Sequence, residues 1–353
     1  MASLSEVKQS VSALVRSQPL VAVFVGGTSG IGQNTVRQLA ITHGADGQGL
    51  RAYIVGRNAS AAAETIALCR QHCPQGQFIF VKAQNLSLIK EVDKTCKEIV
   101  RLETENAHRE HTMPPRIDML YLSIGRLGWG PREDTEDGID SAMSLFYYSR
   151  ARVIIDLLPL LRASSLPAHV VSIYHAGLEG NFIPDDISLR SPENYTFLNR
   201  RSHNIHLTNL FAEALVQQNP GKLSFVHVYP GLVMTTLFEN SSLPGWVKVL
   251  MTLLWPLLRF MSQSDEENGQ RMLYLSTTNF PSSGGQESNT TAIGSNGQRG
   301  SGVYAVDPKS RTVPVLKMDQ KYAGLRAEGM VQKVYDHTMK AFEEAVAGRK
   351  FRD

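Results

Sequence analysis

The feature of this sequence that most constrains its fold is a glycine-rich turn directly after a short apolar run. Residues 21–25 read Val-Ala-Val-Phe-Val, residues 26–32 read Gly-Gly-Thr-Ser-Gly-Ile-Gly, and a helical pattern follows as far as Leu39. Glycines between a strand and a helix let the backbone approach a pyrophosphate group, and the helix N-terminus adds free N–H donors. The motif therefore predicts a dinucleotide site. The residues expected to form it are Gly26, Thr28, Ser29, Gly30, Ile31 and Gly32.

Short β-rich runs alternate with longer helical patterns along the chain, which indicates a parallel sheet covered by helices on both faces. Seven strands are expected, at residues 21–25, 52–55, 78–81, 119–122, 169–173, 224–228 and 303–306. With 353 residues and 42% hydrophobic content, the chain is long enough to bury one large core. The predicted fold class is α/β, a doubly wound and mainly parallel seven-stranded sheet in a single domain over residues 1–353.

Charge and cysteine content exclude several classes of protein. The 36 basic and 33 acidic residues are spread along the chain and give a net charge of +3, so no basic block predicts nucleic-acid binding. The three cysteines have neither a zinc spacing nor an even count for disulfides, which favours reduced thiols. The first 20 residues lack the apolar core of a signal peptide, so a cytoplasmic protein is expected. No metal site is expected, because the His-Arg-Glu-His cluster at 108–111 lacks a ligand spacing.

Two segments interrupt the alternation of strands and helices. Residues 243–262 are rich in Leu and Trp but are broken by Lys248, Pro256 and Arg259, so they are too interrupted to span a bilayer. A helical lid over an apolar substrate pocket is predicted there, and peripheral contact with a membrane surface is the alternative. Residues 281–302 consist mainly of Ser, Gly, Asn, Thr and Gln, which predicts a mobile surface loop without a chemical role.

Four further motifs follow the glycine-rich turn in a fixed order. They are Val-Gly-Arg-Asn at 55–58, Gln-Asn-Leu-Ser at 84–87, the run from 118 to Gly125, and Tyr-Pro-Gly-Leu-Val-Met-Thr at 229–235. Together with the turn, these motifs resemble the short-chain dehydrogenase/reductase family from about Pro19 to Thr236. The resemblance implies a Rossmann-type fold and a nicotinamide dinucleotide as cofactor.

The motifs also predict how the cofactor is held. An NAD-preferring site would place a carboxylate on the ribose 2′-hydroxyl after the second strand, whereas Gly56 leaves room here and Arg57 offers a cation for a 2′-phosphate. NADP(H) is therefore the predicted cofactor. By resemblance, Asn85 stands near the adenine, and the segment after the sixth strand closes over the nicotinamide. The remaining residues expected in the cofactor site are Leu86, Ser123, Gly125, Pro230, Gly231, Val233 and Thr235.

The catalytic positions match the family poorly. The family uses a tyrosine, a lysine four residues later, a serine and an asparagine, and the lysine is needed because a free phenol has a pKa near 10. Here Tyr195 is expected to begin a helix, and Asn199 occupies the lysine position. Arg200 and Arg201 would lie about 100° and 200° further round a regular helix, so neither is a simple substitute. His175 stands at or next to the serine position, as a hydrogen-bonding group or as a structural histidine. The asparagine is missing.

Three functions are compatible with this pattern. The leading one is an NADP(H)-dependent oxidoreductase that acts on a ketone or alcohol, with Tyr195 as proton donor and His175 orienting the oxygen. The second is a cyclase, isomerase or dehydratase in which the same two residues perform acid/base steps, and the third is a noncatalytic nucleotide-binding protein. A narrower resemblance to fungal secondary-metabolite reductases that lack the lysine implies a bulky apolar substrate such as a polyketide or terpenoid. Family resemblance also implies a homodimer, unless the apolar segment and inserted loops cover that surface.

Overall fold

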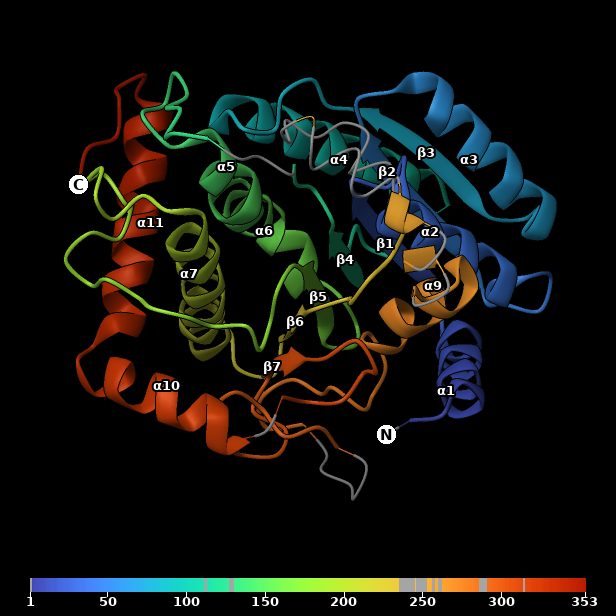
Figure 1. Ribbon diagram of the computed structural model, residues 1–353. Helices are drawn as coiled ribbons and strands as arrows, with labels where there is room; N and C mark the ends of the chain where they lie inside the picture. Colours follow the sequence, from blue (N-terminus) through green and yellow to red (C-terminus); the bar gives the residue numbers. More distant parts are fainter. Residues whose placement is uncertain are drawn as a thin grey trace.

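The computed structural model contains one sheet of seven parallel strands in the order β3-β2-β1-β4-β5-β6-β7 (Figure 1). The structure describes residues 2–110, 113–126, 130–234, 245, 253–255, 258–259, 262–285, 291–313 and 315–353. The strands are β1 (Leu20–Val25), β2 (Leu50–Gly56), β3 (Gln77–Lys82), β4 (Met119–Leu122), β5 (Ala168–Ile173), β6 (Leu223–Val228) and β7 (Val303–Val306). The predicted fold class is confirmed, and every predicted strand lies within two residues of its expected bounds.

Alternating side chains of the strands enter two separate cores, one on each face of the sheet. In β1, Val21, Val23 and Val25 belong to one apolar cluster, whereas Ala22 and Phe24 belong to the other. Successive side chains of a strand point to opposite faces, so a strand that is apolar throughout must be covered on both sides. This is why the parallel strands read as continuous apolar runs rather than alternating ones.

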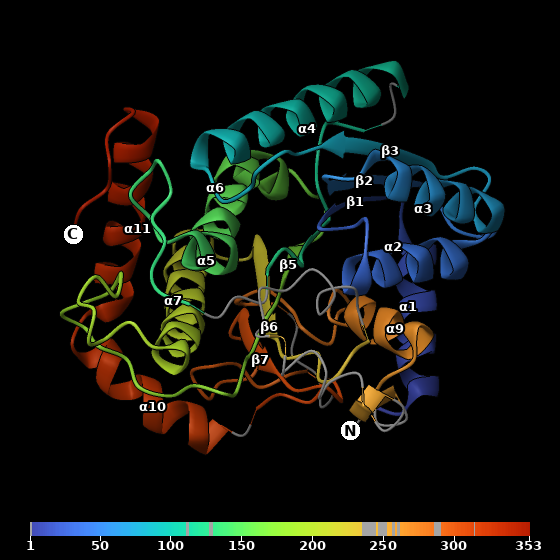
Figure 2. The same ribbon diagram turned by 45° about the horizontal axis from the view of Figure 1, so that its top comes forward.

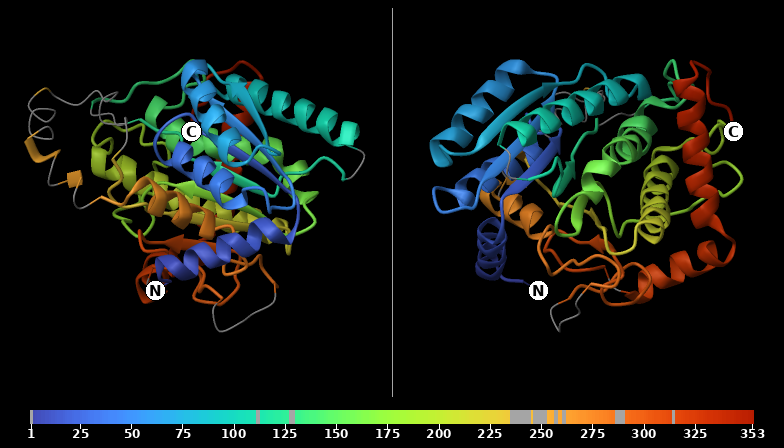
Figure 3. Two further views of the ribbon diagram at one scale, coloured as in Figure 1. Left: turned by 90° about the vertical axis from the view of Figure 1, so that its right-hand side faces the viewer. Right: turned by 180° about the vertical axis from the view of Figure 1, so that it is seen from behind.

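Helices form a layer over each face of the sheet (Figures 1 and 3). One layer consists of α4 (Ile89–Glu110), α6 (Ser149–Arg162), α7 (Phe197–Gln218) and α11 (Met330–Val346). The opposite layer consists of α1 (Leu4–Ser17), α2 (Gly30–His43), α3 (Ala59–His72) and α9 (Asp265–Tyr274). The remaining elements are α5 (Ser141–Met143), the π-helical turn η1 (Ser144–Tyr148) and α10 (Val315–Ala327).

Helix α7 is buried on almost all sides, because α11 lies alongside it on the face away from the sheet (Figures 1 and 2). Phe211 of α7 stacks on Tyr335 of α11, with ring centroids 5.9 Å apart. Leu207, Leu210 and Leu215 of α7 belong to the same apolar core. The part of α7 from Ser202 to Val216 is thus buried within the chain, with α11 on one side of it.

The chain adds β2 and β3 on one side of β1 and adds β4 to β7 on the other side. The point between β1 and β4 where the order changes direction determines where a ligand can bind. β1 pairs with β2 on one side and with β4 on the other, so the connections that follow β1 and β4 leave in opposite directions. In open α/β sheets, ligands bind in the crevice beyond the carboxyl ends of strands at such a point. The glycine-rich turn follows β1, so it lies at this crevice.

Candidate active site at the carboxyl edge of the sheet

The glycine-rich turn connects β1 to α2 in a conformation that requires glycine. Gly26 has a φ of 94° and Gly30 a φ of 55°, in the region that other residues rarely adopt. A Cβ atom on Gly32 would lie 2.5 Å from the carbonyl oxygen of Gly26, so only glycine lets α2 pack this closely on the turn. Ser29 is the N-cap residue, but its side chain makes no capping hydrogen bond. The first-turn amides of α2 therefore face the crevice without a side-chain cap, as a phosphate site needs.

Ser123 and Gly125 support the turn from the end of β4. The Ser123 hydroxyl donates to the carbonyl oxygens of Val25 and Gly26, at 3.1 and 3.2 Å. Gly125 lies against the ring of Phe146, since a Cβ atom there would be 2.5 Å from a ring carbon. Ser123 thus stabilises the turn through hydrogen bonds, and Gly125 lets the aromatic ring approach the chain.

The end of β2 presents a guanidinium group beside the turn. A Cβ atom on Gly56 would lie 2.4 Å from the Thr28 side chain, so this glycine lets the strand end approach the turn. The next residue, Arg57, is exposed. Arg57 has no hydrogen-bonding or ion-pairing partner among the residues that the structure describes, so no neighbouring carboxylate compensates its charge. A cation in this place suits a phosphate on the adenosine ribose.

Asn85 and Leu86, which follow β3, have different surroundings. Asn85 is exposed, and its side-chain oxygen accepts hydrogen bonds from the backbone N–H and the hydroxyl of Ser87, at 3.2 and 2.7 Å. Its amide nitrogen is left as the donor. The Leu86 side chain is buried in the core, and its carbonyl accepts a hydrogen bond from the Ser149 hydroxyl. The structure therefore gives Leu86 a packing role and leaves Asn85 as a polar group at the surface.

The segment after β6 is described only as far as residue 234. Gly231 has a φ of 76°, and a Cβ atom there would meet Pro308 at 2.9 Å. Pro230 precedes it, and the Val233 side chain is buried. Thr235 lies outside the described residues, as does most of the predicted lid at 243–262. No helix in the described part of the chain is both long and apolar enough to cross a bilayer.

His175 lies two residues beyond β5, among aromatic rings. Its ring stacks on Tyr229 with centroids 5.5 Å apart and meets the edge of Tyr174 at 4.5 Å. Its Nδ1 atom is buried without a hydrogen-bond partner in the described structure. Burial, together with the smaller effect of the nearby Arg201 and Arg150 charges, lowers the pKa of His175 to about 4. The imidazole is consequently neutral at neutral pH.

Tyr195 and Asn199 are not arranged as the sequence suggested. Helix α7 begins at Phe197, and Thr196 caps it by accepting a hydrogen bond from the Asn199 N–H at 3.1 Å. The prediction that Tyr195 begins this helix is wrong, because the capping residue and its extended backbone come after it. Tyr195 and Asn199 therefore do not share a helical face, and the Asn199 amide donates to the carbonyl of Asn194 at 2.9 Å.

The Tyr195 hydroxyl is engaged by two charged groups away from His175. It donates to Asp140 at 2.8 Å and accepts from Arg200 at 2.9 Å. Burial raises the pKa of Tyr195 to about 12, and Asp140 raises it while Arg200 opposes the rise. No hydrogen bond or ring contact within the described structure joins Tyr195 to His175. The structure thus brings His175 to the edge of the sheet and holds Tyr195 in a separate network.

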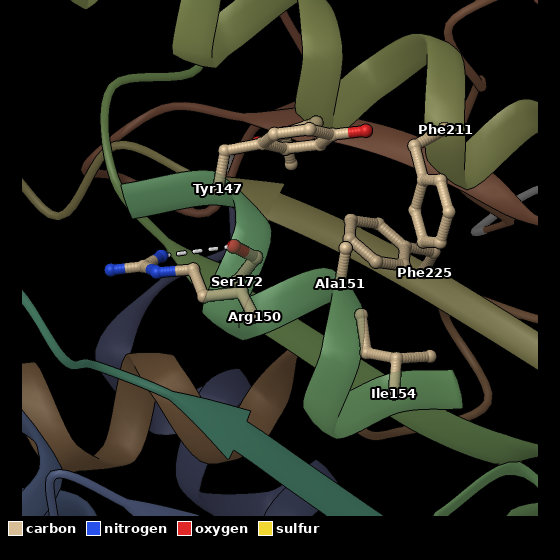
Figure 4. Close-up of a pocket in the computed structure, with 8 residues that line it drawn as sticks. Tyr147, Arg150, Ala151, Ile154, Ser172, Phe211 and Phe225 are labelled. Carbon is tan, nitrogen blue, oxygen red and sulfur yellow. Dashed lines mark hydrogen bonds between the residues drawn. The ribbon is translucent and has the colours of Figure 1, made fainter. Parts of the chain in front are cut away.

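Sequence reasoning missed a buried guanidinium group beneath the site. Arg150 of α6 is 4% exposed and donates to the Ser172 hydroxyl at 2.9 Å and to the Ile173 carbonyl at 2.8 Å (Figure 4). It also donates to the carbonyl of Ile124, which follows β4. Burial lowers the pKa of Arg150 to about 10, so it keeps its charge at neutral pH. No described carboxylate forms an ion pair with it, and it ties together the ends of β4 and β5.

A cavity of about 10 Å³ lies beside Arg150, between α6, α7 and the sheet (Figure 4). Its other lining residues are Tyr147, Ala151, Ile154, Ser172, Thr208, Phe211 and Phe225. A cavity of this size has room for about one water molecule. It is therefore part of the packing behind the site and is too small to hold a substrate.

The described part of the chain offers no cluster of side chains for a metal ion. No group of three or more His, Cys, Asp or Glu side chains among the described residues could hold a metal ion. Cys69, Cys73 and Cys96 are free thiols, all buried.

Comparison with known proteins identifies the family. No protein-family model matches the chain. The chain is 35% identical to a protein named short-chain dehydrogenase/reductase SAT2 from Stachybotrys chartarum, over 98% of both chains. It is 36% identical to oxidoreductase AN1596 from Emericella nidulans, over 98% of this chain and 99% of that one. Oxidoreductase andH from Emericella variicolor is 32% identical over 97% of each chain.

Solved structures agree at the level of the fold. The chain resembles YwfH, an NADPH-dependent reductase involved in bacilysin biosynthesis, with a TM-score of 0.52, 16% identity and coverage of 74% of this chain and 92% of that one. It also resembles levodione reductase, with a TM-score of 0.51, 17% identity and coverage of 74% and 92%. These likenesses, the parallel sheet with its glycine turn, and near full-length identity to fungal oxidoreductases lead to one conclusion. The chain belongs to the short-chain dehydrogenase/reductase family.

Proposed function

We propose that this protein is an NADP(H)-dependent oxidoreductase that acts on a ketone or alcohol group of a bulky apolar molecule. The observation that carries the proposal is the pairing of the glycine turn at 26–32 with the exposed guanidinium of Arg57. The turn presents amides for a pyrophosphate, and Arg57 supplies the charge that separates a 2′-phosphate from a free hydroxyl. When bound, the cofactor supplies or accepts the hydride.

Each part of the cofactor has residues suited to it. The phosphates meet the backbone from Gly26 to Gly32 and the hydroxyls of Thr28 and Ser29. The adenine meets the amide of Asn85, whose oxygen is already used by Ser87. Residues expected at the nicotinamide end are Ser123, Gly125, Pro230, Gly231, Val233 and Thr235. Leu86 supports this arrangement through the core rather than through contact with the ligand.

On the substrate side, His175 is the polar group that we assign to the reacting oxygen. Its neutral imidazole has a buried nitrogen without a partner in the described structure, and it lies beyond β5 on the same sheet edge as the turn. A neutral imidazole forms hydrogen bonds but is not a strong acid. The apolar segment at 243–262 is the proposed cover for the substrate, and its composition fits a polyketide or terpenoid. The relatives SAT2, AN1596 and andH are fungal proteins.

Hydride transfer is tested by following the absorbance of reduced nicotinamide. The purified chain is mixed with NADPH and a panel of bulky polycyclic ketones, and the same panel is repeated with NADH. We expect consumption of NADPH that depends on ketone and is weaker with NADH. Tight binding of NADPH without consumption by any ketone would favour a different reaction.

A non-redox reaction on the same scaffold is the second candidate, and one observation favours it. The Tyr195 hydroxyl is already held by Asp140 and Arg200, so the usual phenol is not free beside His175. An isomerase, cyclase or dehydratase would convert substrate with no change in nicotinamide absorbance. Product analysis by mass spectrometry in the same mixtures distinguishes the two reactions.

A further inference from the structure

The strongest unexplained feature is a group of buried polar atoms that surrounds Tyr174. The Nδ1 of His175, the Nε of Arg201 and the Nε2 of His227 lack hydrogen-bond partners in the described structure. His175 meets the Tyr174 ring edge-on, and His227 stacks beneath it with centroids 6.4 Å apart. A buried polar atom without a partner costs about 1–3 kcal/mol, so a cluster of them needs an explanation.

One face of α7 brings three polar side chains toward the end of β5. Arg201, Asn204 and Thr208 are spaced by three and four residues, so they lie on the same side of the helix. Asn204 and the charge of Arg201 both act on the Tyr174 hydroxyl, and Thr208 lines the cavity beside Arg150. The residue one turn before Arg201 on this face is Phe197, which has no hydroxyl.

The electrostatics of this face are positive. Arg201 lies one turn before Asn204 on this face, and its charge acts to lower the pKa of both His175 and Tyr174. It makes no hydrogen bond or ion pair with any described residue, in contrast to Arg200, which holds Tyr195. Arg150 adds a second guanidinium charge without a carboxylate, and its side chain is buried. Because the histidines are neutral, the two guanidinium groups leave the site with uncompensated positive charge.

We infer that Arg201 binds an anionic oxygen of the substrate, beside the reacting oxygen that we assign to His175. This inference rests on the proposed function for its place beside the cofactor, and it narrows the substrate class to an apolar molecule that carries a carboxylate or an ionised enol. The guanidinium supplies the charge and its unpaired N–H donors to the anion, and the imidazole remains for the reacting oxygen. Such a ligand satisfies the buried donors that the protein leaves without partners.

The test is isothermal titration of the full chain near neutral pH with two probes of one shape, 2-naphthoate and 2-naphthalenemethanol. Wild-type protein is expected to bind the carboxylate at least about tenfold more tightly than the alcohol, which corresponds to about 1.4 kcal/mol. Arg201→Met should abolish this preference, and Arg201→Lys should retain part of it because the charge remains. Arg162→Met is the matched control, since it removes an exposed arginine of α6 away from the site.

NADPH binding, measured by its fluorescence in the same variants, separates this inference from the proposed function. Unchanged NADPH affinity in Arg201→Met with loss of naphthoate binding supports the inference. Naphthoate binding that depends on Arg201 in a protein that does not bind NADPH would refute the proposed function alone. The inference is overturned if wild-type protein does not prefer naphthoate, if it binds neither probe at millimolar concentration, or if Arg201→Met weakens only NADPH.

Discussion

Lowering the pH should destabilise this protein through histidines that are buried without charge. His203 is the clearest example, because it is 0% exposed and both ring nitrogens are engaged. Its Nε2 accepts a hydrogen bond from the Ile183 N–H at 3.0 Å, which leaves Nδ1 to donate to the Ile187 carbonyl at 3.1 Å. Protonation of Nε2 would break the first of these bonds. Burial lowers the pKa of His203 to about 4.

The sign and size of the effect follow from this pKa. As the pH falls through about 6.5, the unfolded chain takes up a proton on His203, but the folded chain does so only near pH 4. The stabilising contribution is therefore complete above pH 6.5 and is lost between pH 6.5 and 4. At pH 5 the loss amounts to about 2 kcal/mol for one such histidine. Burial lowers the pKa of five more histidines in the same direction: His169, His175, His206, His227 and His337.

Urea unfolding followed by circular dichroism at about pH 7 and about pH 5 measures the effect. We expect the free energy of unfolding to fall over this range, and His203→Gln to make that fall smaller by about 2 kcal/mol. The variant His72→Gln, at an exposed position, controls for the loss of a surface imidazole. The reasoning is refuted if His203 titrates near 6.5 by NMR in the folded protein, or if His203→Gln leaves the pH dependence unchanged.

Three further predictions concern the turn, Tyr195 and assembly. Gly32→Ala should lower the free energy of unfolding by about 1–3 kcal/mol and weaken NADPH binding, because its Cβ would lie 2.5 Å from the Gly26 oxygen. Urea unfolding measures the first effect and NADPH titration the second. Unchanged values would show that the turn can relax. Tyr195→Phe should lower the free energy of unfolding by about 1–2 kcal/mol, because the hydrogen bonds to Asp140 and Arg200 are lost, and it should leave NADPH affinity unchanged. A specific loss of turnover in a stable variant would instead make Tyr195 the proton donor. Because α11 covers α7, sedimentation should give a monomer at micromolar concentration, and a dimer that pairs through α7 would contradict this.

The cofactor end of the site could be predicted because its signals are local. The glycine spacing at 26–32 and the Gly56-Arg57 pair are each contained in a few neighbouring residues, and the strand before each fixes its place at the sheet edge. In the structure, the glycine turn follows β1 and Arg57 follows β2, as predicted. Leu86 lies in the loop between β3 and α4, and its side chain packs in the core.

The substrate end could not be predicted in the same way, because it depends on where α7 begins. Because α7 begins at Phe197, Tyr195 lies outside the helix and shares no helical face with Asn199. The Thr196 cap was a readable signal, since threonine followed by helix-forming residues is a typical N-cap. Arg150 had no readable signal, because an arginine in a helical pattern is normally expected to face solvent.

The central claim is that the turn binds a nicotinamide dinucleotide and that Arg57 selects the 2′-phosphorylated form, NADP(H), over NAD(H). Equilibrium titration of the full chain with NADPH and with NADH, in wild-type protein and in Arg57→Ala, tests it most directly. We predict that wild-type protein binds NADPH at least about tenfold more tightly than NADH, and that Arg57→Ala removes this preference while NADH binding stays the same. Absence of affinity for both nucleotides, or an unchanged preference in Arg57→Ala, would contradict the claim.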